Sequence, residues 1–405
     1  MTAGEPDPLD FDAPPHRYSD RTPKDPFTRL RNRLEAPNSP LDRTSELAFV
    51  RSLLRVLEIP ESSQLLVFST TSLQLGLISP SNPRALYFND DTYVGWVPGG
   101  RIEIASIDPE LGAIFYIFDI PDDASPIRAD RSGRCMNCHA GDEVGFVPGL
   151  TIKSVLPGPG GGSLDSFRQI PAGHGVPFET RFGGWHVTGA QGFTNHWGNL
   201  TGRLQEGALI RIPNAPGERF RLDRYPVPTS DLVAHCVHEH QIGYFNRAIV
   251  AGYRVRTYLH SDGPALTAAH LREIQADADE LTRYLLFSDE VLFPGQSIRG
   301  DTSSSYRRDF MRGADRDQNG ASLKELDLST RLFRHRCSYL VHSAQFQALP
   351  PALRDRVLDR IRAAIRETNP DTTLARIDAD ERHFLRTQLA KTVPGFAPSA
   401  QPPEP

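Results

Sequence analysis

The chain of 405 residues has little of what usually decides a function class. It contains four cysteines, three methionines and only four lysines among its 45 basic residues. Its net charge of −5 is small for this length, so the composition gives no basic surface for nucleic acid or anionic membranes. No apolar run approaches the roughly 18 residues that a membrane-spanning helix needs. We therefore expect no nucleic-acid partner and no integral membrane segment.

The first residues also lack the features of a secretory signal. Residues 1–15 are acidic and proline-rich, with neither a basic region nor an apolar stretch. The composition of residues 1–40, rich in Pro, Asp and Arg, predicts a leader that is disordered or lies along the surface, and residues 394–405 are predicted to be a disordered tail.

Between residues 64 and 120, short runs of β-branched and aromatic residues alternate with turn signals. These runs are LLVFS, ALYF, TYVGWVP, RIEIASI and AIFYIF, and the breaks between them include Asn-Asp, Pro-Gly-Gly and Asp-Pro-Glu-Leu-Gly. This pattern predicts an antiparallel sheet. An apolar stripe at helical spacing predicts a helix before it, over residues 42–59 and ended by Pro60.

The second half of the chain has a helical pattern. Helices are predicted after a cap at Thr229 or Ser230, and over residues 266–287, 351–367 and 379–391. The fold class is therefore α+β, with an antiparallel-sheet-rich N-terminal half and a helical C-terminal half. A sheet-rich segment over 41–156 and a Gly/aromatic and helical region over 164–393 are expected on either side of the flexible PGPGGGS sequence.

The most informative segment is CMNCH, in which Cys135 and Cys138 are followed at once by His139. In the CxxCH motif two thiols add to the two vinyl groups of haem, and the adjacent histidine becomes the proximal iron ligand. The motif occurs once. We therefore expect one haem c, held by Cys135 and Cys138 and ligated by His139.

Three other interpretations of these cysteines stay open. Cys236 and His240, four residues apart on one helical face, could complete a zinc site with Cys135 and Cys138. A thioredoxin-like redox pair would need a βαβ context that the flanking sequences do not offer. A simple structural disulfide is the third alternative.

The sixth iron ligand is less determined by the sequence. Methionine is scarce: Met136 lies inside the motif, and Met311 lies in a polar, arginine-rich stretch. Histidine is the better candidate. His196 is flanked by aromatic and glycine residues in TNHWGN, and His240 lies on the long predicted helix, followed by His174 in a GHG loop. An open or water-ligated position is the remaining option.

Two further patterns resemble metal sites but match them poorly. The DRDQNG sequence starts like a calcium loop, yet its twelfth position is Leu326 instead of glutamate, which indicates a turn. His235, His238 and Glu239 share one helical face without a zinc-motif spacing, so a solvated or packed face is the simpler interpretation.

The chain resembles an uncharacterised bacterial family of large proteins with one cytochrome-c haem motif. The similarity runs from about residue 60 to residue 393. It rests on QLLVFSTTSLQ, SPSNPRALYFNDDTYVGWVPGG, IEIASIDPELGAIFY, CMNCH, RFGGWHVTGAQGFTNHWGN, the EHQ and FNRA of the long helix, SLKELDLSTRLF and CSYLVHS. The resemblance implies haem attachment at Cys135, Cys138 and His139. The chain departs from the family pattern at His186, where an aromatic is expected, at Arg336, where proline is expected, and at the glycine before His174, where an acid is expected.

Such proteins usually look exported, so the resemblance implies a periplasmic or exported location, with a signal peptide that is not present in this chain. The chain is about four times longer than a simple carrier needs. The first hypothesis is an electron-transfer cytochrome c that acts with a redox partner protein. The second is a haem peroxidase or oxidase with an open distal face, and the third is a zinc-stabilised binding protein without haem.

Overall fold

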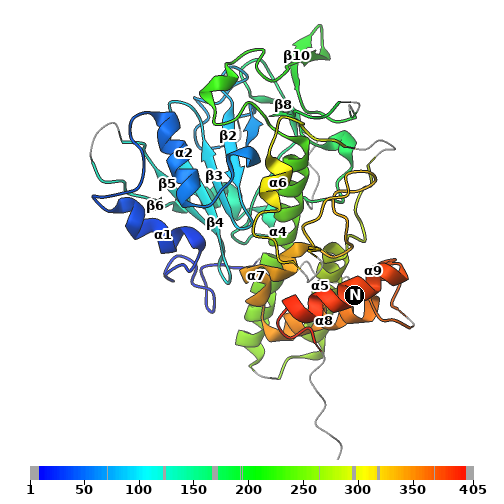
Figure 1. Cartoon of the computed structure of the whole chain (residues 1–405). Coiled ribbons are helices and arrows are strands. Elements are labelled where there is room, and N and C mark those ends of the chain that lie inside the picture. The colour runs from blue at the N-terminus through cyan, green and yellow to red at the C-terminus, as the bar shows by residue number, and fades with distance from the viewer. Residues whose placement is uncertain are drawn as a thin grey trace, which may run out of the picture.

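The computed structural model describes residues 9–70, 72–121, 125–166, 172–191, 193, 195–263, 265–293, 298–316, 320–368 and 370–397. Its N-terminal half is built on a large antiparallel sheet and its C-terminal half is helical (Figure 1), which confirms the predicted α+β class. Among the helices of these residues, none combines the length and apolar character needed to cross a membrane.

The main sheet has seven strands in the order β6-β5-β4-β3-β2-β1-β9. The strands are β1 Leu65–Val67, β2 Arg84–Phe88, β3 Thr92–Trp96, β4 Ile102–Asp108, β5 Gly112–Phe118, β6 Asp130–Arg131 and β9 Trp185–His186. Every neighbouring pair is antiparallel. The alternating apolar residues of the predicted runs therefore point to opposite faces of one sheet.

Each face of the sheet is covered by helices. Tyr87, Val94 and Trp96 point to the face that packs against α1 (Pro26–Glu35) and α2 (Glu46–Val56). Phe88, Tyr93 and the ring of Phe115 point to the opposite face, which α4 (Leu232–Asp262) covers. Figure 1 shows α1 and α2 in blue on one side of the sheet and α4 in green on the other.

The described part of the leader differs from the prediction of disorder. Residues 9–40 lie on the sheet, with Tyr18, Phe27 and Leu34 buried in the core shared with α1 and α2. Asp25 caps α1 by accepting a hydrogen bond from the Thr28 N–H. A few apolar anchors in a polar composition are enough to fix this segment, because the sheet face would otherwise be exposed. Residues 1–8 and 398–405 lie outside the described residues, whereas Phe396 of the predicted tail is buried.

The long helix α4 begins one residue later than predicted. Asp231, not Thr229 or Ser230, caps it, because its carboxylate accepts a hydrogen bond from the Val233 N–H at 3.0 Å. The Ser230 hydroxyl instead donates to the carbonyl oxygen of His186 at 2.6 Å. The start of α4 is thereby attached to β9.

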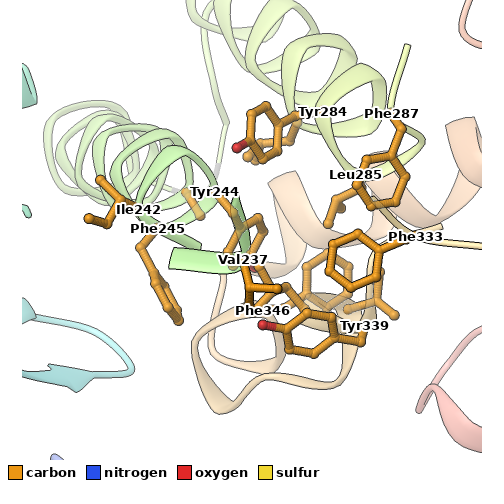
Figure 2. Packing of buried hydrophobic residues seen from close by; sticks show 14 of the residues in the cluster. Val237, Ile242, Tyr244, Phe245, Tyr284, Leu285, Phe287, Phe333, Tyr339 and Phe346 are labelled. Carbon is orange, nitrogen blue, oxygen red and sulfur yellow. The ribbon is translucent and has the colours of Figure 1, made fainter. Parts of the chain in front are cut away.

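The C-terminal helices form the second half of the core. They are α5 (Ala268–Leu285), α6 (Tyr306–Phe310), α7 (Ala344–Gln347), α8 (Pro351–Ala364) and α9 (Ala379–Thr392). Helices α5 and α8 pack against each other and against α4. Figure 2 shows Val237 and Tyr244 of α4 facing Leu285 of α5 and the rings of Phe333 and Tyr339. The predicted helices over 266–287, 351–367 and 379–391 agree with α5, α8 and α9 to within a few residues.

Two hairpins lie beside the sheet. Strands β7 (Val155–Pro157) and β8 (Ser163–Ser166) enclose the PGPGGGS sequence, which forms a hydrogen-bonded turn where a flexible break was predicted. Strands β10 (Leu200–Gln205) and β11 (Ala208–Pro213) form the other hairpin.

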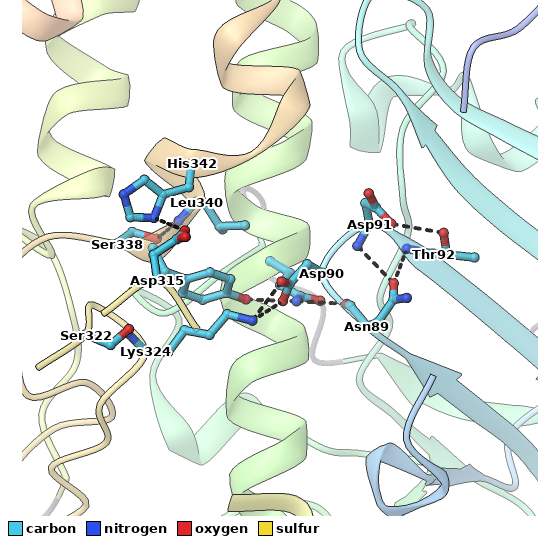
Figure 3. A network of polar contacts seen from close by, with 12 residues as sticks. Asn89, Asp90, Asp91, Thr92, Asp315, Ser322, Lys324, Ser338, Leu340 and His342 are labelled. Carbon is cyan, nitrogen blue, oxygen red and sulfur yellow. Dashed lines mark hydrogen bonds and ion pairs between the residues drawn. The ribbon is translucent and has the colours of Figure 1, made fainter. Parts of the chain in front are cut away.

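An ion pair between a mostly buried lysine and an exposed aspartate joins the two halves of the molecule. Figure 3 shows Lys324, from the segment after α6, reaching Asp90 in the turn between β2 and β3. The Lys324 ammonium donates to both carboxylate oxygens of Asp90, at 2.8 and 2.7 Å, and lies over the ring of Phe310. The sheet and the helices therefore share polar contacts as well as one apolar core.

Candidate haem-attachment site

The CMNCH segment lies at the edge of the main sheet, directly after β6. Strand β6 pairs with β5 through Tyr116 and Arg131, and the Ser132 N–H donates to the carbonyl oxygen of Phe115 at 2.9 Å. A 3₁₀ turn over Gly133–Cys135 then runs into the short helix α3 (Met136–His139). The sheet edge therefore fixes where the motif begins.

The two motif thiols are free and lie on one side of this helical turn. Cys135 and Cys138 are three residues apart, and residues at this spacing are neighbours on a helix surface. Cys138 is exposed, while Cys135 is half-buried and its burial raises the pKa of the thiol. Both thiols remain available for addition to a group placed over this side of the turn.

The imidazole of His139 is oriented by the loop that follows the motif. Its Nδ1 lies 3.0 Å from the carbonyl oxygen of Gly149, so in the neutral ring Nδ1 carries the proton and donates it there. The ring packs on Phe115 with centroids 4.3 Å apart. Burial lowers the pKa of His139 to about 4, so the ring is neutral at pH 7. The lone pair of Nε2 is therefore free to bind a metal.

The position of Gly149 is itself fixed by α4. The Asn246 side chain accepts a hydrogen bond from the Leu150 N–H at 2.9 Å and donates one to the Leu150 carbonyl oxygen at 2.7 Å. The Gly149 N–H also donates to the carbonyl oxygen of His139 at 2.8 Å. The histidine and the carbonyl that orients it are thus held by two different elements.

His196, the first predicted distal ligand, has the opposite tautomer. Its Nδ1 accepts a hydrogen bond from the Gly198 N–H at 2.9 Å, so the proton of the neutral ring is on Nε2. Burial lowers the pKa of His196 to about 4. The ring packs beside Phe182 and Phe193 and lines an open cleft of about 630 Å³ together with Asp301. Its lone pair is already used.

His240, the second predicted distal ligand, is fully buried and has no free ring nitrogen. Its Nδ1 lies 2.8 Å from Nδ1 of His174, and its Nε2 lies 2.8 Å from the Ser338 hydroxyl. The ring also stacks with Tyr284 and with Phe287. Both ring nitrogens are therefore occupied by partners within the protein.

The alternative metal sites are not assembled in the described residues. Nowhere among them do three or more His, Cys, Asp or Glu side chains gather closely enough to hold a metal ion. Cys236 is buried in the core, where burial raises the pKa of its thiol, whereas Cys138 is exposed. His235, His238 and Glu239 are buried, so of the two alternatives for this helix face, solvated or packed, the packed one holds. Residues 317–319 of the calcium-like sequence lie outside the described residues.

A charged pair near the motif was not predicted from the sequence. Arg84 of β2 and Glu103 of β4 form an ion pair at 2.7 Å, and both side chains are mostly buried. Their charges act on the pKa of His139, which Arg84 lowers and Glu103 raises. The sequence did offer a signal for this pair, because Arg84 and Glu103 are charged residues within otherwise apolar strands.

Comparison of the chain with known protein families, curated proteins and solved structures found no match.

Proposed function

We propose that the protein is a c-type haem protein that transfers electrons through one covalently attached haem. One observation supports this most strongly: the motif has two free thiols on one helical side, followed by a histidine whose Nε2 alone is left for iron. Cys135 and Cys138 would form the two thioether bonds, and His139 would be the proximal ligand. The bound haem would supply a one-electron Fe(III)/Fe(II) couple.

The residues around His139 orient its ring in the way that is typical of an iron-ligating histidine. A ligating histidine commonly donates its second ring N–H to a carbonyl oxygen, which fixes the ring orientation and makes the ligand more basic. The Gly149 carbonyl meets this requirement, and Asn246 of α4 holds the loop that carries it. Phe115 limits rotation of the ring from the sheet side. A redox partner protein and an exported location follow from the same proposal.

The tautomers of the other histidines favour a second candidate, an oxidase or peroxidase with an open sixth position. His196 and His240 were the predicted distal ligands, and neither has a lone pair available. A haem without a strong sixth ligand binds small molecules at the iron. The same attachment site would then support reduction of oxygen or peroxide instead of simple electron transfer.

The test is expression of the chain with an export signal and the c-type maturation machinery. A reduced pyridine haemochrome spectrum of the c type is expected, and the haem should remain on the protein in acidified solvent. The matched controls are Cys135→Ala with Cys138→Ala, which remove both thioethers, and Cys236→Ala, which removes a thiol from the core. Haem that extracts completely, or no haem at all, would exclude both candidates.

Cyanide binding to the ferric protein separates the two candidates. Rapid binding at neutral pH is expected for an open sixth position. A low-spin spectrum that cyanide leaves unchanged would instead favour the six-coordinate electron carrier.

A further inference from the structure

We propose that Arg84 binds a carboxylate of the haem, one of its propionates, and that Glu103 positions the Arg84 guanidinium for this contact. The inference rests on the haem attachment proposed above and extends it to a second group of residues, on the sheet. It gives a function to the ion pair of Arg84 and Glu103, which lies outside the CMNCH motif.

The strand register places this pair on the face of the sheet where the motif lies. Ala105 of β4 lies opposite Phe115 of β5, the residue that packs on His139. Glu103 is two residues along the same strand and therefore points to the same face as Ala105. Diagonal neighbours on one face lie about 7–8 Å apart, so Glu103 is close to the ring that supports the histidine.

Arg84 reaches Glu103 by crossing the strand between them. Arg84 is on β2 and Glu103 is on β4, and Gly95 of β3 is directly opposite Glu103. A Cβ atom on Gly95 would lie only 1.9 Å from Arg84 Nη2, so the missing side chain leaves the room for the guanidinium. The guanidinium of Arg84 therefore occupies the space over Gly95, where a side chain would otherwise lie.

The ion pair leaves hydrogen-bonding groups unused. Nη2 of Arg84 contacts Oε2 of Glu103 at 2.7 Å, but Arg84 Nε and Glu103 Oε1 are buried and have no hydrogen-bond partner among the described residues. Buried polar atoms of this kind are usually paired in native proteins, because leaving one unpaired costs free energy. A guanidinium N–H forms strong, charge-assisted hydrogen bonds with carboxylates, so the unpaired N–H of Arg84 is suited to bind one.

A second cation of this region is less suited to the role. Lys153 is partly exposed and already pairs with Glu143 at 3.2 Å. Arg84 is therefore the mostly buried cation with a free donor at this site.

The ligand that this donor fits is a haem propionate. Thioether bonds form at the vinyl side of the macrocycle, so a haem fixed by Cys135 and Cys138 keeps both propionates free to meet the protein. A free anion from solution would have to compete with Glu103 for the guanidinium. A propionate would be held there by its covalent attachment, which raises its local concentration.

The test compares midpoint potentials of the attached haem in four variants. Arg84→Gln is expected to lower the potential, because it removes a positive charge that disfavours the ferric state, and Glu103→Gln is expected to raise it. Gly95→Ala displaces the guanidinium without changing any charge and should shift the potential in the direction of Arg84→Gln. Arg221→Gln removes an arginine from an exposed pair with Asp223 and should leave the potential unchanged.

A second readout detects the contact itself. The haem-propionate bending band in the resonance Raman spectrum should move in Arg84→Gln and in Gly95→Ala, and not in Arg221→Gln. Haem that is attached in the wild type, with unchanged potentials and Raman bands in the Arg84 and Gly95 variants, would overturn this proposal alone. If Arg84→Gln does not load haem, Gly95→Ala and Glu103→Gln decide the question. A wild-type chain without haem would refute the attachment as well.

Discussion

At the scale of single residues, the position of one proton separates the histidines of this protein. His139 donates its Nδ1 proton to the Gly149 carbonyl and keeps Nε2 free, whereas His196 accepts at Nδ1 and is protonated at Nε2. Sequence alone indicated all of these histidines as candidate ligands. It could not indicate the tautomers, because the Gly149 carbonyl and the Gly198 N–H meet the rings only in the folded chain.

His196 and His240 are expected to have no role as iron ligands. His196→Ala and His240→Ala should each leave the spin state of the ferric haem as in the wild type, because both rings use their lone pairs within the protein. The measurement is the visible and electron paramagnetic resonance spectrum of the loaded protein. His139→Ala is the positive control and should lose the proximal ligand. A change from low spin to high spin in His196→Ala would contradict this assignment.

The four thiols are expected to react at different rates in the haem-free chain. Cys138 is exposed and should be alkylated by iodoacetamide first, and Cys135 should follow because burial raises its pKa and reduces its thiolate fraction. Cys236 and Cys337 are buried and should react only after unfolding. Peptide mapping by mass spectrometry gives the order. Early modification of Cys236 in the native chain would show that the core is packed differently.

At the scale of elements, α4 carries more buried polar groups than an ordinary core helix. Glu239 of α4 pairs with Arg181 at 3.1 Å, and both side chains are almost fully buried. Burial raises the pKa of Glu239 to about 7, which the Arg181 cation counteracts. The Arg181 guanidinium also donates to the carbonyl oxygens of His174 and Val176. Arg181 therefore connects the segment before β9 to α4 through an ion pair and backbone hydrogen bonds.

Loss of Arg181 is expected to destabilise the fold strongly. Arg181→Leu should lower the free energy of unfolding by about 3–5 kcal/mol, because it leaves the carboxylate of Glu239 buried without its partner. Urea denaturation measures this cost. The double variant Arg181→Leu with Glu239→Leu should recover much of the stability, because it removes the unpaired charge. A double variant that is no more stable than Arg181→Leu would contradict this explanation.

Most elements could be predicted from local sequence, and the exceptions have physical reasons. The period-two pattern of the strands and the apolar stripes of α2, α5 and α8 each mark a face that must be buried, so they were visible in the sequence. The cap of α4 was misplaced by one or two residues, since Thr229, Ser230 and Asp231 can all cap a helix and the Ser230 hydroxyl is used by the His186 carbonyl oxygen. The ion pair of Arg84 with Glu103 depends on strand register, which no local pattern shows.

At the scale of the whole molecule, one core on each face of the sheet explains why the leader is ordered from residue 9. Phe27 is completely buried between α1 and the sheet, and the hydroxyl of Tyr18 donates to the Ala113 carbonyl oxygen at 2.8 Å. Composition suggested disorder because it averages over residues and misses a small number of anchors. Composition likewise gave no indication of the ion pair between Lys324 and Asp90, which joins the two halves of the molecule.

The protein is expected to lose stability as the pH falls below about 6.5. Eight histidines besides His139 have pKa values that burial lowers, to about 3 or 4 where a value is assigned: His16, His174, His186, His196, His235, His238, His240 and His342. The unfolded chain binds these protons below pH 6.5 and the folded chain does not, so each group costs up to about 1.4 kcal/mol per pH unit until its folded pKa is reached. Glu239 and Asp91, whose pKa values burial raises to about 7 and 6, act in the opposite direction but are outnumbered.

Urea denaturation of the loaded protein at pH 7.5 and at pH 5.5 checks this expectation. The midpoint should be clearly lower at pH 5.5. An equal or higher midpoint at the lower pH would mean that these histidines are not buried in the neutral form.

The most direct test of the central claim is the intact mass of the matured protein after denaturation and extraction with acidified solvent. The account predicts a chain that is heavier by one haem, with two alkylatable thiols remaining, at Cys236 and Cys337. A chain of unmodified mass with four alkylatable thiols, produced under conditions that mature a known c-type cytochrome, would contradict it.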